Sequence, residues 1–462
     1  MTSTAHPDPA LMSDIGGAPV AAAGSPTGLR TGSLFGFSLG MVGDRIFRDA
    51  PALLLLLYMT NFLAIPPAMA GLAIFVPKLL IMAVDPLVGT FSDRLSTPWG
   101  RRRPLMLIGA ILASAAIVLF FHVPRFGSPV HQSIYMSITV FLGFTGYSLY
   151  SVPYLTMASE IANSDEERRK IMSWRVMFMA IGLSISAFAG GFMQAIGGGE
   201  RGYSIMAWTY GSVCLVTMLA TVFATAGVPI AQGDKSTMSL KEQVRLLASS
   251  RRYLRLLLVG FLQKLGEGVG YGSFAYFCIY VVQQPLTGIG LVVLAGTAGQ
   301  VISQPAWLWA SKRWSPSNLY TISTLAWCFN LLLWLAMKGQ SSWWLLPLGL
   351  QAGIAAGGLQ MVTLGKLSNV MAADAAECGV NREGIYSGFW LAAEKLAFAL
   401  GALVVGSVLG LFGFVESSEG ATVTQSPTAV LGIALTYSGI NLLIYLASIV
   451  AMRRLARFEA QG

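Results

Sequence analysis

Charged residues are scarce in this chain. Only 11% of its 462 residues are Asp, Glu, Lys or Arg, and 55% are hydrophobic. A soluble domain carries roughly 25% charged residues, so most of this chain has no water to face. The mean hydropathy of +0.64 agrees. The composition excludes a soluble protein and predicts an all-α membrane protein.

Histidine and cysteine are also few, at 3 and 4 residues. Their spacing fits neither a metal site nor a disulfide framework. A membrane-embedded enzyme would need clustered His, Cys or carboxylate ligands, and an ATP-driven pump would need a G-x-x-x-x-G-K-[ST] loop, which is missing. The sequence therefore predicts no enzyme activity, no metal and no cofactor.

Long apolar stretches fill the rest of the chain, and each is long enough to cross a bilayer, which takes about 20 residues. Six precede and six follow the longest polar interruption, at 228–252. We expect a disordered tail over 1–30, two pseudo-symmetric six-helix bundles over 31–227 and 253–455, and a short end at 456–462. The twelve expected spans are about 31–64, 69–92, 104–122, 131–160, 171–196, 203–227, 253–283, 287–311, 318–337, 342–371, 384–414 and 429–455.

The net charge of +9 is distributed in alternate loops. Lys and Arg gather between the second and third spans, between the fourth and fifth, in the central 228–252 segment and at the C-terminal end. The intervening loops hold Arg125, Arg201 and Lys338. By the positive-inside rule both termini are cytoplasmic. We expect a multi-pass inner-membrane protein, monomeric, with the bilayer and a small solute as partners and no nucleic acid.

A faint internal repeat links the two halves. Asp85-Pro86 recurs 219 residues later as Gln304-Pro305, and the same offset places Arg45 on Lys264 and Arg175 on Glu394. Two equivalent halves are typical of secondary transporters, whose substrate site lies between them.

Several ionisable residues fall inside the expected spans, where each costs at least about 2.5–3.5 kcal/mol. Asp44 and Arg48, like Arg45 and Asp49, are four residues apart and can pair within one helix. Lys78 and Asp85 share a helix face. The full set is Asp44, Arg45, Arg48, Asp49, Lys78, Asp85, Arg175, Lys264, Glu267, Glu394 and Lys395. These groups are either internally neutralised or face a solute cavity.

From this set we assign candidate roles. Asp44, Asp85 and Glu394 are candidates for a titrating group that couples transport to protons. Arg48, Asp49, Lys78, Lys264 and Glu267 are expected in intramembrane charge pairs. Aromatic faces with fixed polar groups suit a sugar ring, although they suit core packing too. The candidate substrate-binding residues are Arg45, Tyr150, Arg175, Trp390 and Lys395. Three converging cations, Arg45, Arg175 and Lys395, would favour an acidic solute.

The loop after the second span has a mechanical interpretation. It reads GTFSDRLSTPWGRRRP from Gly89 to Pro104, and its charges can bridge helix ends and hold a gate closed. The alternative is a basic loop that only sets topology. The candidate gating residues are Gly89, Asp93, Arg94, Gly100, Arg101 and Arg102.

These motifs resemble the glycoside–pentoside–hexuronide:cation symporter family of the major facilitator superfamily, which includes melibiose carriers. The resemblance runs through DPLVG…SDR…WGRRRP, VPY at 152–154, SDEERRK, SWR at 173–175, and YSGFW up to Glu394-Lys395; the GRRRP form is similar to sucrose transporters. It implies the twelve-helix major facilitator fold. Asp85, Arg175 and Lys395 stand where melibiose carriers have an acidic residue, a sugar-site basic residue and a basic residue.

Other positions depart from that family pattern. Arg45, Ile81 and Ser151 stand where the melibiose carriers have acids, and Leu155 where they have a stacking aromatic. Because cation coordination needs convergent oxygens, the resemblance does not carry sodium coupling with it.

The sequence thus predicts a secondary active transporter that moves a sugar-like or other polar organic solute by alternating access, coupled to protons and not to sodium. Two alternatives stay open within transport: a uniporter, or a carrier of an amphipathic or acidic solute such as a uronide or lysolipid. A non-transporting receptor on a transporter fold is a remote third.

Overall fold

The computed structural model describes residues 31–95, 97–124, 126–161, 165–226, 250–378, 383–418 and 423–461, with Glu242, Arg245 and Leu247. The tail at 1–30 and most of the linker at 228–252 lie outside these residues, so the domain boundaries drawn from the sequence stay predictions.

The described chain is helical throughout, apart from loops and one isolated antiparallel bridge between Leu63 and Ser418. The helices of the first part are α1 (Thr31–Asn61), α2 (Pro67–Arg94), α3 (Arg103–Phe120), α4 (Pro129–Glu160), α5 (Asp165–Ala187), α6 (Ala189–Ala195) and α7 (Gly199–Ala224). Those of the second part are α9 (Arg251–Tyr276), η2 (Phe277–Val282), α10 (Thr287–Ile302), α11 (Gln304–Ser311), α12 (Pro316–Leu335), η3 (Ser342–Trp344), α13 (Leu345–Cys378), α14 (Glu383–Leu411), α15 (Pro427–Ala434), η4 (Leu435–Ile440) and α16 (Asn441–Gln461).

Local signals explain where these helices begin. The Ser128, Ser315 and Ser426 hydroxyls each accept a hydrogen bond from a backbone N–H of the first turn, and a proline follows each serine. A serine cap followed by proline fits a helix start, because proline's missing N–H is not needed there. The expected all-α membrane fold is confirmed.

Fewer membrane spans are identified in the described residues than the twelve that the sequence predicted. Within the described ranges seven helices are long and apolar enough to cross a membrane, and up to nine if two bent pairs each count as one span. The bent pairs are α5 with α6 and α10 with α11, each bent by 41°. Helices α1, α4 and α9 are also long, and α1 carries four charges near its middle. The count of twelve stays a prediction.

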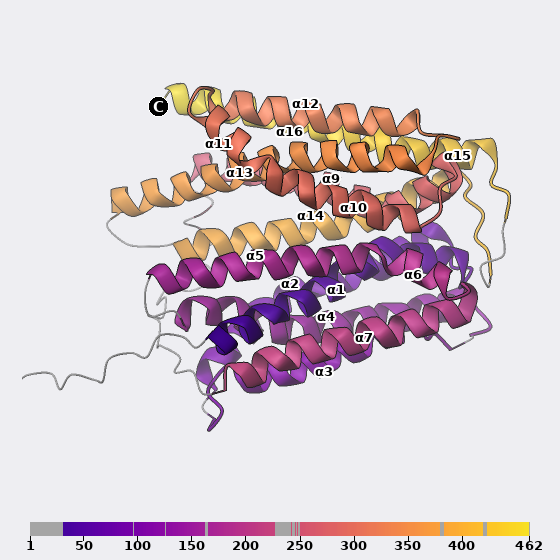
Figure 1. Ribbon diagram of the computed structural model, residues 1–462, viewed down its shortest axis with the longest axis horizontal. Coiled ribbons are helices and arrows are strands. Elements are labelled where there is room, and N and C mark those ends of the chain that lie inside the picture. The colour runs from indigo at the N-terminus through magenta and orange to yellow at the C-terminus, as the bar shows by residue number, and fades with distance from the viewer. Residues whose placement is uncertain are drawn as a thin grey trace, which may run out of the picture.

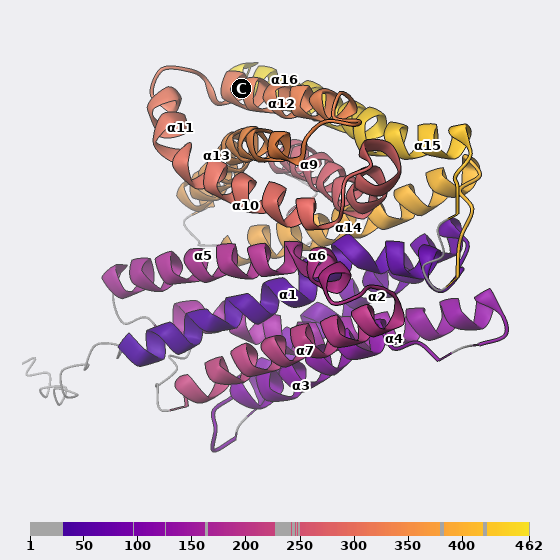
Figure 2. The same ribbon diagram turned by 45° about the vertical axis from the view of Figure 1, so that its right-hand side comes forward.

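Two bundles of helices lie side by side (Figures 1 and 2). Helices α1 to α7 pack among themselves, as do α9 to α16. The bundles meet along a seam where α2 packs on α14, α1 on α9, and α5 and α6 on α10. We call this contact zone the seam.

Glycines set the close approach of these helices. A Cβ on Gly406 of α14 would overlap Gly71 and the Pro67 carbonyl of α2 across the seam. Within the second bundle, Gly401 lies directly against Gly268 of α9. Small residues at such crossings let helix backbones approach closely, which is how membrane helices gain packing energy.

Hydrogen bonds across the seam gather near the C-terminal end of α1, which we call the Asn61 end. Helix α15 is labelled on the right in Figure 1. The Thr60 and Tyr276 hydroxyls lie 2.7 Å apart, and Asn61 Nδ2 donates to the Tyr280 hydroxyl at 2.6 Å. Ser417 Oγ donates to the Asn61 carbonyl at 2.9 Å. This end of the seam is therefore closed in the structure.

Candidate functional site

Helix α1 presents a compact charge cluster to the seam. The fully buried Asp49 carboxylate receives Arg48 Nε at 2.8 Å and has Arg45 Nη1 at 3.6 Å. The four-residue spacing of Arg45 and Asp49 gives the pair expected. Arg48 turns to Asp49 and not to Asp44, so the second expected pair does not form. Asp44 is buried, and its carboxylate interacts electrostatically with Arg48 and Tyr147.

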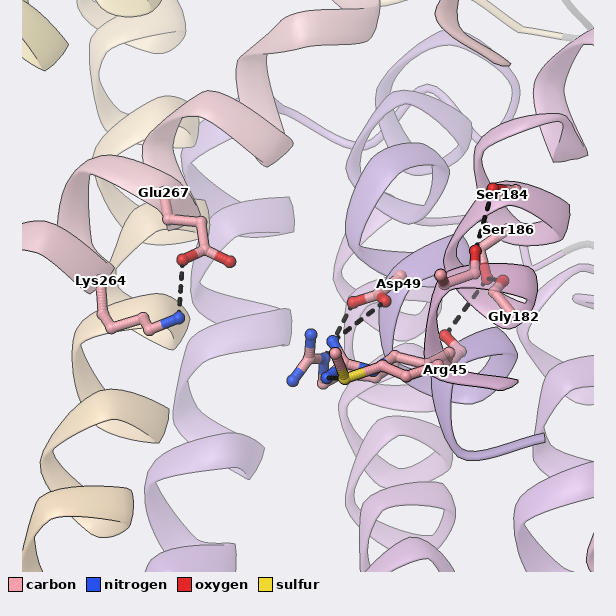
Figure 3. A network of polar contacts seen from close by, with 10 residues as sticks. Arg45, Asp49, Gly182, Ser184, Ser186, Lys264 and Glu267 are labelled. Carbon is pink, nitrogen blue, oxygen red and sulfur yellow. Dashed lines mark hydrogen bonds and ion pairs between the residues drawn. The ribbon is translucent and has the colours of Figure 1, made fainter. Parts of the chain in front are cut away.

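Helix α9 presents a second intrahelical ion pair that faces the first. Lys264 Nζ lies 2.8 Å from Glu267 Oε2. Figure 3 shows this pair and the Arg45–Asp49 pair pointing toward one another across the seam. Lys264 is the residue that the internal repeat matches to Arg45, so each bundle contributes one ion pair at an equivalent position. Glu394 of α14 lies near both Lys264 and Glu267.

A third ion pair bridges the two bundles directly. Lys395 Nζ of α14 pairs with Asp85 Oδ2 of α2. The Ser148 hydroxyl of α4 donates to the other oxygen of that carboxylate at 2.5 Å. Asp85 is therefore held by one hydroxyl from its own bundle and one ammonium from the partner bundle. Both charged residues stand out in the sequence as ionisable groups within expected spans, but no local pattern indicates that they meet or that Ser148 joins them.

Among the described residues, Arg175 has no carboxylate partner. Its guanidinium lies 5.1 Å from the Tyr154 ring centroid, and its Nη atoms lie 3.7 Å from the sulfurs of Met41 and Met172. Its buried Nε has no hydrogen-bond partner. Among the described residues, its charge is therefore surrounded by soft sulfur and ring contacts.

Lys78 departs from the expected charge pairing. Among the described residues it forms no ion pair, and its Nζ instead lies 4.7 Å from the Phe144 ring centroid and 5.9 Å from that of Phe398. Lys78 shares a helix face with Asp85, but Lys395 occupies that carboxylate. A small cavity lies beside Lys78 at the seam.

The two aromatic candidates for substrate binding, Tyr150 and Trp390, are both buried. Tyr150 is fully buried inside the first bundle, where its hydroxyl lies against Gly40 of α1 and Thr221 of α7. The tyrosines of α4 sit at helical spacing, and the face that they form packs on α1. Trp390 packs its ring against Gly260 of α9 and leaves its buried Nε1 without a partner. Tyr150 therefore packs in the core of the first bundle, and substrate binding by Tyr150 or Trp390 stays a prediction.

The structure describes the side chains or backbone of some of the expected gating residues but not the side chains of Asp93 and Arg94. Arg102 Nη1 donates to Ser92 Oγ at 3.4 Å and is buried, and Gly100 takes a φ of +85° in the turn before α3. Gly89 lies within α2, against Val152 of α4. Arg101 also has an interaction partner. The side chains of Asp93 and Arg94 lie outside the described residues, so a gating role for these two stays a prediction.

Comparisons with known proteins agree with this architecture. Residues 36–456 match the family model described as MFS/sugar transport protein. The chain is 23% identical over 451 residues to the isoprimeverose transporter of Lactiplantibacillus pentosus, covering 92% of this chain and 90% of that one. It is 25% identical over 410 residues to the glucuronide carrier protein homolog of Escherichia coli (strain K12), covering 87% of each.

A solved structure shares the fold. It is a bacterial homolog of the human lysosomal transporter Spinster, in an inward-facing and unoccupied conformation, with a TM-score of 0.65 and 14% identity, covering 94% of this chain and 97% of that one. At this identity the likeness shows the fold alone. The family match covers almost the whole chain and its members are transporters, not enzymes. The chain belongs to the MFS/sugar transport protein family and is a multi-pass membrane transporter.

Proposed function

We propose that this protein is a proton-coupled symporter for a sugar-like or other polar organic solute, working by alternating access. Secondary transport of sugar-like solutes is the activity of its family. The solute site lies at the seam, between the α1 and α9 ion pairs. Arg45 and Arg175 of the first bundle, with Glu394 and Lys395 of the second, are the polar groups proposed to line it.

The ion pair between Asp85 and Lys395 is the observation on which the coupling rests. It joins helices of opposite bundles, so it must break when the bundles separate at that level. A proton on Asp85 removes the negative charge that holds Lys395. A ligand or proton shifts a conformational equilibrium only through different affinity for its two states, and this carboxylate has different partners in the joined and separated states.

Sodium fits this site poorly. Sodium-type coordination needs several convergent oxygens. The two positions where melibiose carriers supply further acids hold Ile81, which is buried and apolar, and Ser151. Among the described residues, no group of three His, Cys, Asp or Glu side chains could hold a metal ion. Asp85 has its oxygens engaged by Ser148 and Lys395 instead.

A specific observation favours a second candidate, carriage of an acidic solute. Arg175 and Lys78 are cations without a carboxylate partner among the described residues. The glucuronide carrier homolog, to which the chain is similar over most of its length, is named for an acidic glycoside.

Uptake into proteoliposomes tests the coupling. An inwardly directed proton gradient should drive accumulation of a radiolabelled solute, and replacing sodium by choline at fixed pH should leave the rate unchanged. Protein-free liposomes provide the control. Uptake that is abolished by choline replacement would refute proton coupling in favour of sodium, and equilibration without accumulation would indicate a uniporter.

A further inference from the structure

Lys78 lies where the two bundles touch near the middle of α2. Its ammonium sits between the ring of Phe144, from α4 of the first bundle, and the ring of Phe398, from α14 of the second. The two rings therefore belong to opposite sides of the seam. This contact exists only while the bundles are joined at this level.

Most other cations at the seam have their own carboxylates, and Arg175 instead contacts the Tyr154 ring and the sulfurs of Met41 and Met172. Arg45 and Arg48 share Asp49, Lys264 has Glu267, and Lys395 has Asp85. Within the described parts of the chain, Lys78 has no acid, and the charged group acting on it is Arg48, another cation. Taking an ammonium out of water without a counter-charge is unfavourable, and a nearby like charge adds to that cost.

Aromatic rings offset part of this cost. A cation above a ring face is attracted by the ring's quadrupole, more strongly where water is excluded. When α2 and α14 separate, however, Phe398 moves away with the second bundle and Lys78 loses one of its two partners. In the open seam, the Lys78 ammonium therefore needs a new partner in place of Phe398.

Space for a ligand group begins beside this ammonium. A cavity lined by Lys78, Phe144, Phe398, Tyr271, Gly268 and Gly272 has a volume of about 20 Å³ for a water-sized molecule. That volume is enough for about one water, so no sugar-sized solute fits while the seam is closed. Its walls come from both bundles, so the cavity must widen when they part.

We infer that Lys78 binds the anionic group of the solute, a carboxylate or a sulfonate on a sugar-sized molecule, and that Phe144 and Phe398 hold the ammonium when the site is empty. The inference rests on the proposed function and adds the charge of the solute. It also assigns the anion to a residue other than Arg45 and Lys395, whose charges are already neutralised by Asp49 and Asp85.

Matched solute pairs test this assignment. Methyl β-D-glucuronide with methyl β-D-glucoside, and D-galacturonate with D-galactose, differ in the acidic group. Binding is measured as ligand-induced thermal stabilisation of the full chain in detergent, because a ligand of the folded state raises its stability. We expect wild-type protein to bind an acidic member, and Lys78→Gln to weaken it by about 10- to 100-fold, the range for losing a charged hydrogen bond.

The neutral member of the same pair should change by less than about 3-fold in Lys78→Gln, since its contacts do not involve the ammonium. Lys78→Arg should restore most of the acidic solute's affinity. The exposed Lys338, in the turn after α12, provides the control, and Lys338→Gln should change neither affinity.

The outcomes separate the inference from the function on which it rests. Equal loss of acidic and neutral binding in Lys78→Gln would make Lys78 a structural cation and overturn the inference. Wild-type protein that binds and transports the neutral members alone also overturns it but leaves the proposed function standing. Wild-type protein that binds and transports none of the four overturns both.

Discussion

Single residues at the seam differ mainly in whether a counter-charge reaches them. Arg45 and Lys264 are paired with acids of their own helices, and Lys395 is paired with an acid across the seam. Among the described residues, Lys78 has aromatic rings in place of an acid. Spacing along a helix indicated the pairs formed within one helix. The cross-seam pair links residues 310 positions apart, so no local pattern could indicate it.

Asp85 is the residue whose substitution should separate coupling from transport. Asp85→Asn removes the charge that holds Lys395. The Asp85 side chain is 18% and the Lys395 side chain 43% exposed, so the stability cost should fall between that of exposed and buried pairs, about 1–2 kcal/mol. We expect proton-driven accumulation to be lost while solute exchange at equal pH on both sides persists.

The double variant Asp85→Asn/Lys395→Gln is the matched control for that prediction. It removes both charges, so no unpaired ammonium remains. Its thermal stability should recover relative to Asp85→Asn, measured by differential scanning fluorimetry, while accumulation stays lost. Accumulation at the wild-type level in Asp85→Asn would show that another group carries the proton.

Helices in this fold are positioned by glycine contacts and by breaks. The repeat that aligns Asp85-Pro86 with Gln304-Pro305 has different consequences in the two halves. Pro86 lies inside the continuous α2, whereas the second helix breaks at Ser303 and bends by 41° into α11. Proline weakens a helix turn but does not by itself decide whether the helix bends.

Contact between α9 and α14 depends on Gly401. A Cβ at this position would overlap the backbone of Gly268, which cannot rotate away as a side chain can. Gly401→Ala should therefore lower the apparent Tm by several degrees, because overpacking of a close contact costs about 1–3 kcal/mol. The measurement is thermal unfolding in detergent.

Gly388 is the matched control, on the same helix α14 but with open space around its Cα. Gly388→Ala should leave the Tm unchanged or raise it slightly, since alanine favours a helix over glycine by up to about 1 kcal/mol. Equal destabilisation by both substitutions would mean that the α9–α14 contact is not the cause.

Over the whole molecule, the seam is closed at the Asn61 end and is joined further along by Asp85 and Lys395. Alternating access requires that closed end to open. The backbone bridge between Leu63 and Ser418 joins the two bundles there.

A disulfide across that bridge should stop transport reversibly. Residues opposite each other in an antiparallel bridge lie about 4.5–5.5 Å apart between Cα atoms, within disulfide range. The double variant Leu63→Cys/Ser418→Cys should lose uptake after mild oxidation and regain it with dithiothreitol. Each single variant under the same oxidant is the control. Full uptake with the disulfide formed would mean that this end does not open.

Orientation in the membrane is predicted by the distribution of Lys and Arg. With both termini cytoplasmic, a cysteine at position 98 in the loop before α3 should react with an impermeant maleimide only after cells are broken open. A cysteine at Lys338, in an exposed turn, should react from outside. The opposite labelling pattern would reverse the orientation, and labelling of both from outside would contradict an alternating topology.

The sequence by itself determined the class of this protein. Low charge and long apolar stretches are local properties, so they specified membrane helices and their approximate ends, and short motifs carried the resemblance to the family. They also identified the charged residues at the seam. Helical periodicity gives the face on which a side chain lies, but not which helix that face meets.

Only the tertiary structure decided the partners. It joined Asp85 to Lys395, left Lys78 between two phenyl rings and buried Tyr150 in the first bundle. These outcomes depend on how closely glycines let helices approach and how each helix is rotated about its axis. Both follow from the packing of the two bundles against each other.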